Sequence, residues 1–223
     1  MEVKRDVAID IAGDGTVSGL WLAPAIPRAC LVLAHGAGAG MTHASMAAIA
    51  GGLQERGVAT LRFQFPYMER GSKRVDPPAI AHATVRGAVL EARKHAGKLP
   101  LFAGGKSFGG RMASQTQAEA PLEGVRGLVF FGFPLHPAGA PSVERAAHIK
   151  EVRIPMLFLQ GTNDALAKVA LIRRTVASLG QRATLKLIVD ADHSFHVPKR
   201  SGRTADAAMG EVLDCASRWM IET

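Results

Sequence analysis

The chain is poor in cysteine, in aromatic residues and in long apolar segments. Its 223 residues include two cysteines, one tyrosine and two tryptophans. Cys30 and Cys215 fall on a predicted strand and a predicted helix among apolar neighbours, so we expect two buried structural thiols rather than a disulfide. Neither belongs to a cluster of metal-ligating residues, and we expect neither a metal ion nor a cofactor.

Segments that would carry the chain to or across a membrane are also lacking. The longest apolar stretches, such as Leu128 to Leu135, are far shorter than the roughly 20 residues of a spanning helix. The first ten residues, MEVKRDVAID, have no apolar region behind their charges. We therefore expect no secretory signal peptide, no membrane partner and a cytoplasmic location.

The charge of the chain is strongly positive but widely spread. The net charge is +8, from 27 Lys and Arg residues against 19 Asp and Glu residues. The mild basic clusters at 70–74 and 199–203 accompany no groove-reading motif, and the few aromatic rings offer little for base stacking. We expect a solvated basic surface and no nucleic-acid partner.

What the sequence does contain is a regular alternation of short apolar runs with helical patterns. No repeat, low-complexity tract or linker divides residues 1–223, so we expect one domain. The alternation is typical of an α/β fold, with a mostly parallel twisted sheet of about eight strands and helices on both faces.

The first two predicted strands, 3–11 and 17–22, are joined by the turn Gly13-Asp14-Gly15 and predict an antiparallel hairpin. The other predicted strands cover 29–34, 59–63, 101–104, 127–131, 156–160 and 184–189, and the predicted helices cover 43–56, 79–95, 109–119, 166–179 and 204–220. In such sheets ligands bind at the carboxyl ends of the strands, so the functional residues are expected there.

The loop after strand 101–104 carries the candidate nucleophile, Ser107. It reads GKSFG at 105–109, a G-x-S-x-G pattern between an apolar strand and a helix-compatible run. A strand-to-helix elbow of this kind holds the serine in a strained backbone conformation, and the flanking glycines avoid clashes. A phosphate-binding P-loop would need a glycine where Pro100 stands, so we reject that interpretation.

Strand 29–34 runs into the glycine-rich segment HGAGAG at 35–40. A dinucleotide fingerprint would need its third glycine where Met41 stands, and no acidic residue ends the following strand. The pattern H-G-x-G instead predicts a loop that presents a backbone N–H group to an oxyanion, with a second N–H from the residue after the nucleophile. We assign these donors to Ala37 and Phe108, and expect His35 to orient the loop.

Two further strand ends supply a candidate acid and a candidate base. Asp164 follows strand 156–160, where an aspartate either caps the next helix or fixes the tautomer of a catalytic histidine. His193 is the first histidine after strand 184–189, and we prefer it to His196 as the base.

The segment before this histidine contains two rival acids, Asp190 and Asp192. Asp192 adjoins His193 and is poorly placed to face its Nδ1. Asp164 therefore remains the preferred acid.

On these residues the chain resembles the α/β-hydrolase superfamily, in which the triad follows in the chain order Ser, Asp, His. It is more closely similar to a small dienelactone-hydrolase-like branch without a cap, which includes the testis-expressed protein 30 group. The similar segments are LAHGAGAG at 33–40, LRFQFPYME at 61–69, GGKSFGGR at 104–111, FPLHP at 133–137 and DHSF at 192–195. True dienelactone hydrolases carry cysteine at the position of Ser107, so their substrate is not transferred.

The resemblance implies a serine hydrolase with its nucleophile on an eight-stranded sheet. We expect hydrolysis of a carboxylic ester through an acyl-enzyme, although thioesterases and peptidases share the same machinery. The branch also includes scaffolds, so the alternative is a catalytically silent protein that binds a protein partner.

The substrate side of the predicted site is open. Only about two dozen residues separate strands 127–131 and 156–160, which leaves no room for a cap domain. Tyr67, Arg70 and His136 lie in loops that leave carboxyl strand ends, so they are candidate substrate-binding residues, with loop packing or solvation as the alternative. If the basic loop around Arg70 binds substrate, the small-molecule ester is anionic.

Overall fold

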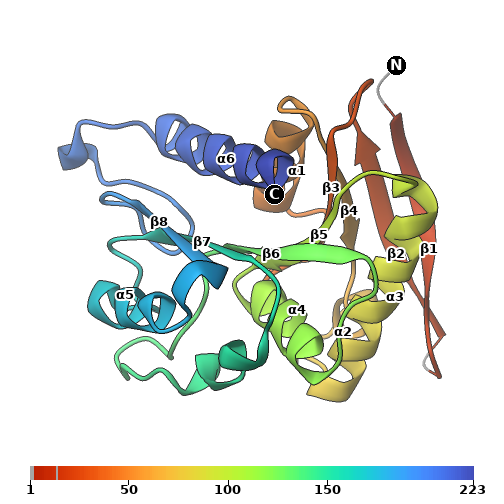
Figure 1. Ribbon diagram of the computed structural model, residues 1–223, viewed down its shortest axis with the longest axis horizontal. Coiled ribbons are helices and arrows are strands. Elements are labelled where there is room, and N and C mark those ends of the chain that lie inside the picture. Colours follow the sequence, from red (N-terminus) through yellow and green to blue (C-terminus); the bar gives the residue numbers. More distant parts are fainter. Residues whose placement is uncertain (1–2, 14) are drawn as a thin grey trace.

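The computed structural model describes residues 3–13 and 15–223, which form an eight-stranded sheet with helices on both faces (Figure 1). The strands are β1 (Val3–Ile11), β2 (Gly15–Ala23), β3 (Ala29–Ala34), β4 (Val58–Phe63), β5 (Leu101–Lys106), β6 (Val125–Phe131), β7 (Met156–Gly161) and β8 (Ala183–Ile188). Their order across the sheet is β1-β2-β4-β3-β5-β6-β7-β8.

β2 runs in the direction opposite to that of the other seven strands. It pairs antiparallel with β1 and β4, and all the other pairs are parallel. The predicted mostly parallel α/β sheet is therefore confirmed, as is the antiparallel pairing of the first two strands. Asp14 of the predicted turn lies outside the described residues.

Helices α1 (Ala44–Gln54) and α6 (Ala205–Glu222) cover one face of the sheet, and α3 (Pro78–Ala96), α4 (Phe108–Glu119) and α5 (Val169–Ala177) cover the other (Figure 1). Short helices lie in the connections: α2 (Pro66–Glu69), η1 (Glu144–Glu151), η2 (Gly180–Arg182) and η3 (Lys199–Ser201). Among the residues that the structure describes, none of the helices combines the length and apolarity that a membrane crossing requires.

Two apolar layers hold the helices on the sheet. In α1 the helical spacing of Met46, Ile49 and Leu53 turns all three side chains inward, where they are fully buried. Strands β3 and β7 are buried along their whole length, which explains why they appear in the sequence as continuous apolar runs. Each such large side chain contributes about 1.5–3 kcal/mol to stability when it is buried.

The predicted strands and helices are all present, with shifts at some of their ends and additional short helices in the connections. The helix expected from residue 166 begins at Val169, because the residues before it form a loop around Asp164. Helix α2 was not expected; Pro66 occupies its first turn, where a missing N–H costs no hydrogen bond.

Between β6 and β7 the only helical element is η1, so no cap domain covers this end of the described sheet. Both cysteines are free thiols, as expected; Cys30 is buried and Cys215 is partly buried.

Candidate active site

Ser107 stands at the sharp turn between β5 and α4, with a φ of 51° and a ψ of −116°. Few residues other than glycine adopt a positive φ, so the backbone is strained at this serine. The neighbouring glycines permit the turn. A Cβ on Gly105 would lie 2.2 Å from the Ala34 carbonyl oxygen, and a Cβ on Gly109 would lie 2.5 Å from that of His35. The G-x-S-x-G pattern therefore lets β5 and α4 pack directly against the end of β3.

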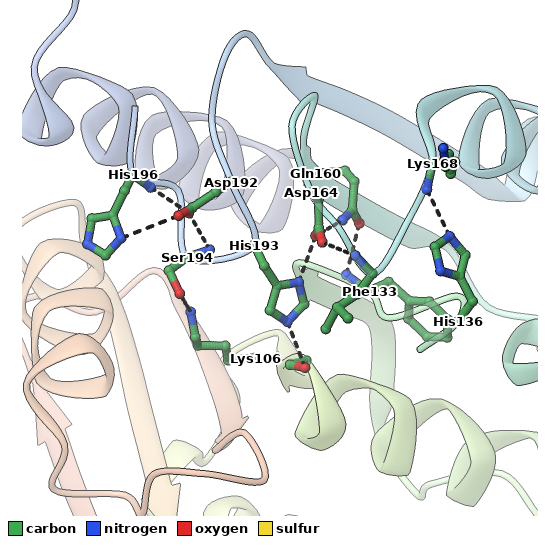
Figure 2. A network of polar contacts seen from close by, with 12 residues as sticks. Lys106, Phe133, His136, Gln160, Asp164, Lys168, Asp192, His193, Ser194 and His196 are labelled. Carbon is green, nitrogen blue, oxygen red and sulfur yellow. Dashed lines mark hydrogen bonds and ion pairs between the residues drawn. The ribbon is translucent and has the colours of Figure 1, made fainter. Parts of the chain in front are cut away.

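The structure brings Ser107, His193 and Asp164 together from the ends of β5, β8 and β7. The His193 Nε2 atom lies 2.8 Å from Ser107 Oγ, and its Nδ1 lies 2.7 Å from Asp164 Oδ2 (Figure 2). A carboxylate on Nδ1 keeps the imidazole proton there and leaves Nε2 free to accept the proton of the serine hydroxyl. This geometry would allow His193 to take the proton of the Ser107 hydroxyl.

The Asp164 carboxylate is fully buried and accepts from more than the histidine. Its Oδ1 accepts from the Leu166 N–H at 2.7 Å, and its Oδ2 also accepts from Gln160 Nε2 (Figure 2). The other end of the Gln160 amide accepts from the Phe133 N–H at 2.9 Å.

Gln160 is not among the residues predicted from the sequence. The signal that could have found it is a polar residue near the end of an otherwise apolar strand, MLFLQG. Because buried polar groups are rarely left without a partner, that position indicates a hydrogen-bonded network.

The rival residues near His193 form no hydrogen bond with the Ser107 hydroxyl in the described chain. His196 is largely exposed, with 73% of its side chain accessible, and its Nδ1 lies 3.8 Å from Asp192 Oδ2. The Asp192 carboxylate accepts from the backbone N–H groups of Ser194 and His196 (Figure 2). Asp190 adopts a positive φ of 60° in the turn after β8. These residues shape the loop that carries His193.

A second serine–histidine contact joins α4 to η1. Ser114 Oγ lies 2.7 Å from His148 Nε2, but the same hydroxyl donates to the Arg111 carbonyl oxygen at 2.9 Å. The hydroxyl proton is therefore already used, and His148 is the donor in the contact. Burial lowers the pKa of His148 to about 4, and no carboxylate of the described residues forms an ion pair with it. This pair lacks the features of an activated nucleophile.

The loop after β3 is held from two sides. The His35 Nδ1–H donates to the Gly36 carbonyl oxygen at 2.7 Å, and its Nε2 accepts from the Phe65 N–H at 3.1 Å. Burial lowers the pKa of His35, which favours this neutral form. The Tyr67 hydroxyl donates to the Ala37 carbonyl oxygen at 2.9 Å. As expected, His35 orients the loop.

The two predicted oxyanion donors border Ser107. Ala37 and Ser107 line the same cavity, and Phe108 is the first residue of α4, directly after the serine. Within the described chain, neither the Ala37 nor the Phe108 N–H donates to a backbone carbonyl. Both groups are therefore available to a ligand.

The three residues expected to bind substrate take other positions, which corrects the sequence-based expectation. Tyr67 is fully buried and holds the loop after β3, because the short helix α2 turns its ring inward. Arg70 pairs with the buried Asp76 at 2.7 Å. His136 is buried, and one ring nitrogen bonds to the Pro137 carbonyl oxygen. The other accepts from the Lys168 N–H (Figure 2). None of the three lines the cavity: Tyr67 and His136 pack within loops, and Arg70 is a largely exposed partner of Asp76.

The cavity beside Ser107 has a volume of about 670 Å³, within the range of small-molecule sites. It lies between the loop after β3, the start of α1, the loop after β8 and the start of α6. Most of its walls are apolar or small side chains: Ala37, Ala39, Ala44, Met46, Ala48, Leu166, Phe195, Ala205 and Met209. Ser107 and His193 lie in its lining, so a molecule bound in the cavity would contact both side chains.

Comparisons with known proteins agree with this architecture. A family model described as an alpha/beta hydrolase domain matches residues 27–221. A dienelactone hydrolase from Anabaena variabilis superposes with a TM-score of 0.80 at 22% identity, covering 99% of this chain and 98% of that one. A serine hydrolase without a lid from Xanthomonas campestris gives 0.75 at 21% identity over 97% and 94% of the chains. An esterase domain from Rhodothermus marinus gives 0.71 at 15% identity over 99% and 98%. At these identities the structural likeness concerns the fold, while the family match covers most of the sequence: the chain belongs to the alpha/beta hydrolase family.

Proposed function

We propose that this protein is a serine hydrolase that cleaves carboxylic esters, with Ser107 as nucleophile, His193 as base and Asp164 as the orienting acid. The observation that carries the proposal is the unbroken chain of hydrogen bonds from Asp164 through His193 to the Ser107 hydroxyl, at the wall of a cavity. The same hydroxyl sits in a strained elbow, a conformation that persists where function requires it.

The reaction begins with attack of Ser107 Oγ on the ester carbonyl carbon while its proton moves to His193 Nε2. The developing oxyanion accepts hydrogen bonds from the N–H groups of Ala37 and Phe108, and loss of one such donor typically costs about 3 kcal/mol of transition-state stabilisation. His193 then protonates the departing alcohol, which leaves an acyl-enzyme on Ser107. Water, activated by the same histidine, releases the acid.

Ester cleavage is the hydrolytic reaction that the site supports best. The cavity is open and mainly apolar, which suits a small acyl or alcohol group. The esterase domain and the dienelactone hydrolase with similar folds support the same class of reaction. We further propose that residues 1–223 form one domain, that the chain belongs to the branch of testis-expressed protein 30, and that it is cytoplasmic.

The decisive experiment is labelling with a fluorophosphonate, which reacts only with an activated serine. The wild type should gain the mass of one probe, and Ser107→Ala should gain none. Ser114→Ala is the matched control, because Ser114 also contacts a histidine but donates its proton to a carbonyl; it should label like the wild type. An unlabelled wild type would contradict the proposal and favour a silent scaffold that binds a protein partner.

A further inference from the structure

Lys106 is the last residue of β5 and directly precedes Ser107, and within the described chain its ammonium group forms no ion pair with an acid. The side chain lines the same cavity as the serine. Its Nζ donates to Ser194 Oγ at 3.3 Å (Figure 2). Within the described chain, no carboxylate oxygen lies within ion-pair distance of this nitrogen.

The surroundings of Lys106 make this cation unusual. Burial lowers the pKa of its ammonium group, against the opposing fields of Asp192 and Asp164. Both carboxylates are already engaged, Asp164 by His193 and Asp192 by the backbone of its own loop. A partly desolvated cation without an acid is costly, and an anionic ligand would offset that cost.

The other basic residues near the carboxyl ends of the neighbouring strands do not compete for this role. Arg70 is paired with Asp76, and Arg62 is buried and donates to the Met41 carbonyl oxygen. Lys73 is exposed and outside the cavity. Among the described residues that line the cavity, Lys106 is the one lysine or arginine.

We propose that Lys106 is a specificity-determining residue that binds a carboxylate group of the ester substrate inside the cavity. The inference rests on the proposed ester hydrolysis and names its substrate class as anionic esters. Because Lys106 directly precedes the nucleophile, a carboxylate on either the acyl or the alcohol part has a short distance to span. Substrates with the carboxylate on the acyl part and substrates with it on the alcohol part show which part of the ester Lys106 binds.

The test compares kcat/KM for matched pairs of substrates. The acyl pair is the p-nitrophenyl monoester of glutarate and a neutral p-nitrophenyl ester of equal chain length. The alcohol pair is the acetate ester of hydroxybenzoate and that of hydroxybenzamide. The wild type should prefer the anionic member of at least one pair. Lys106→Gln, which keeps a donor for Ser194 but removes the charge, should lower that preference roughly 10- to 100-fold, the effect of losing one hydrogen bond to a charged group.

Lys73→Gln is the matched control, because it removes the same net charge from an exposed position; the preference should stay as in the wild type. A wild type that hydrolyses both pairs through Ser107 without any preference overturns the inference and leaves the proposed function intact. An equal loss on all four esters in Lys106→Gln also overturns it, because the lysine would then act by positioning the loop of Ser194. Failure to hydrolyse any ester, together with absent fluorophosphonate labelling, contradicts the proposed function itself.

A measurement on the wild type keeps the inference testable if Lys106→Gln does not fold. Glutarate should inhibit hydrolysis of a neutral ester competitively, and the uncharged glutaramide should inhibit at least about tenfold more weakly. Equal inhibition by the two compounds overturns the inference.

Discussion

At the scale of single residues, the buried carboxylate of Asp164 is the acceptor on which several hydrogen bonds of the candidate site depend. Three N–H groups converge on it, from His193, Gln160 and the Leu166 backbone. An amide in the same place has one acceptor oxygen and presents its own donors, so at least one of the three N–H groups would lose its acceptor. The geometry therefore makes this position sensitive to a change of a single atom.

We expect Asp164→Asn to fold but to lose about four orders of magnitude in kcat, because the tautomer of His193 would no longer be held. Steady-state hydrolysis of a p-nitrophenyl ester measures the loss. Asp192→Asn is the control and should keep most of the turnover, because Asp192 accepts both N–H groups of its loop through Oδ1, an acceptor that asparagine retains. Near-normal turnover in Asp164→Asn, with collapse in Asp190→Asn, would move the acid role to Asp190.

At the scale of elements, the site depends on how closely α4 approaches the end of β3. The contact is made over Gly109, where a side chain would meet the backbone of Ala34 and His35 at 2.5–2.6 Å. Backbone atoms cannot move aside as a flexible side chain can. The conformation of the turn at Ser107 therefore depends on the packing of α4 against β3 as well as on the strained backbone of the serine.

Gly109→Ala should destabilise the protein by about 1–3 kcal/mol, the usual cost of overpacking, and should lower ester hydrolysis as α4 is displaced. Gly51→Ala, in the interior of α1, is the matched control, because nothing lies within 4 Å of the added Cβ there. It should stabilise the protein by about 0.5–1 kcal/mol, the helix preference of alanine over glycine. Urea unfolding followed by circular dichroism measures both changes, and a neutral effect of Gly109→Ala would refute the argument.

At the scale of the whole molecule, buried neutral histidines link stability to pH. Burial, with the nearby charges of Arg111 and His82, lowers the pKa of His148 from 6.5 to about 4. The unfolded chain therefore takes up a proton between these values while the folded protein does not, so stability is lost as the pH falls from about 6.5 towards 4. Burial lowers the pKa of His35 as well, which adds to the loss.

When the pH is lowered from 7 to 4, the free energy of unfolding should fall less in His148→Gln than in the wild type. The difference between the two losses should be about 1–3 kcal/mol. Urea unfolding at a series of pH values measures this difference. His196→Gln serves as the control, because His196 is largely exposed and should leave the pH profile unchanged. Identical pH profiles for the wild type and His148→Gln would show that His148 does not carry the linkage.

The sequence predicted the type of every main helix and strand and its position along the chain. Ser107, Asp164 and His193 were chosen because each follows a predicted strand, and the parallel sheet brings those ends together. Their catalytic roles stay a prediction until the labelling and kinetic tests are made. The role of Gln160 could not be predicted, because the N–H group that its amide oxygen accepts belongs to Phe133, which is distant in the chain.

The sequence by itself determined the parallel sheet, the elbow and the strand ends that carry the candidate residues. Periodicity and glycine spacing are local properties, written in consecutive residues. Only the tertiary structure decided which side chains reach the cavity. Tyr67, Arg70 and His136 leave the right strand ends but turn into loop packing or an ion pair, while Lys106 faces the cavity. The physical reason is that the direction of a loop side chain depends on distant partners, such as Ala37 for Tyr67, that proximity in sequence does not reveal.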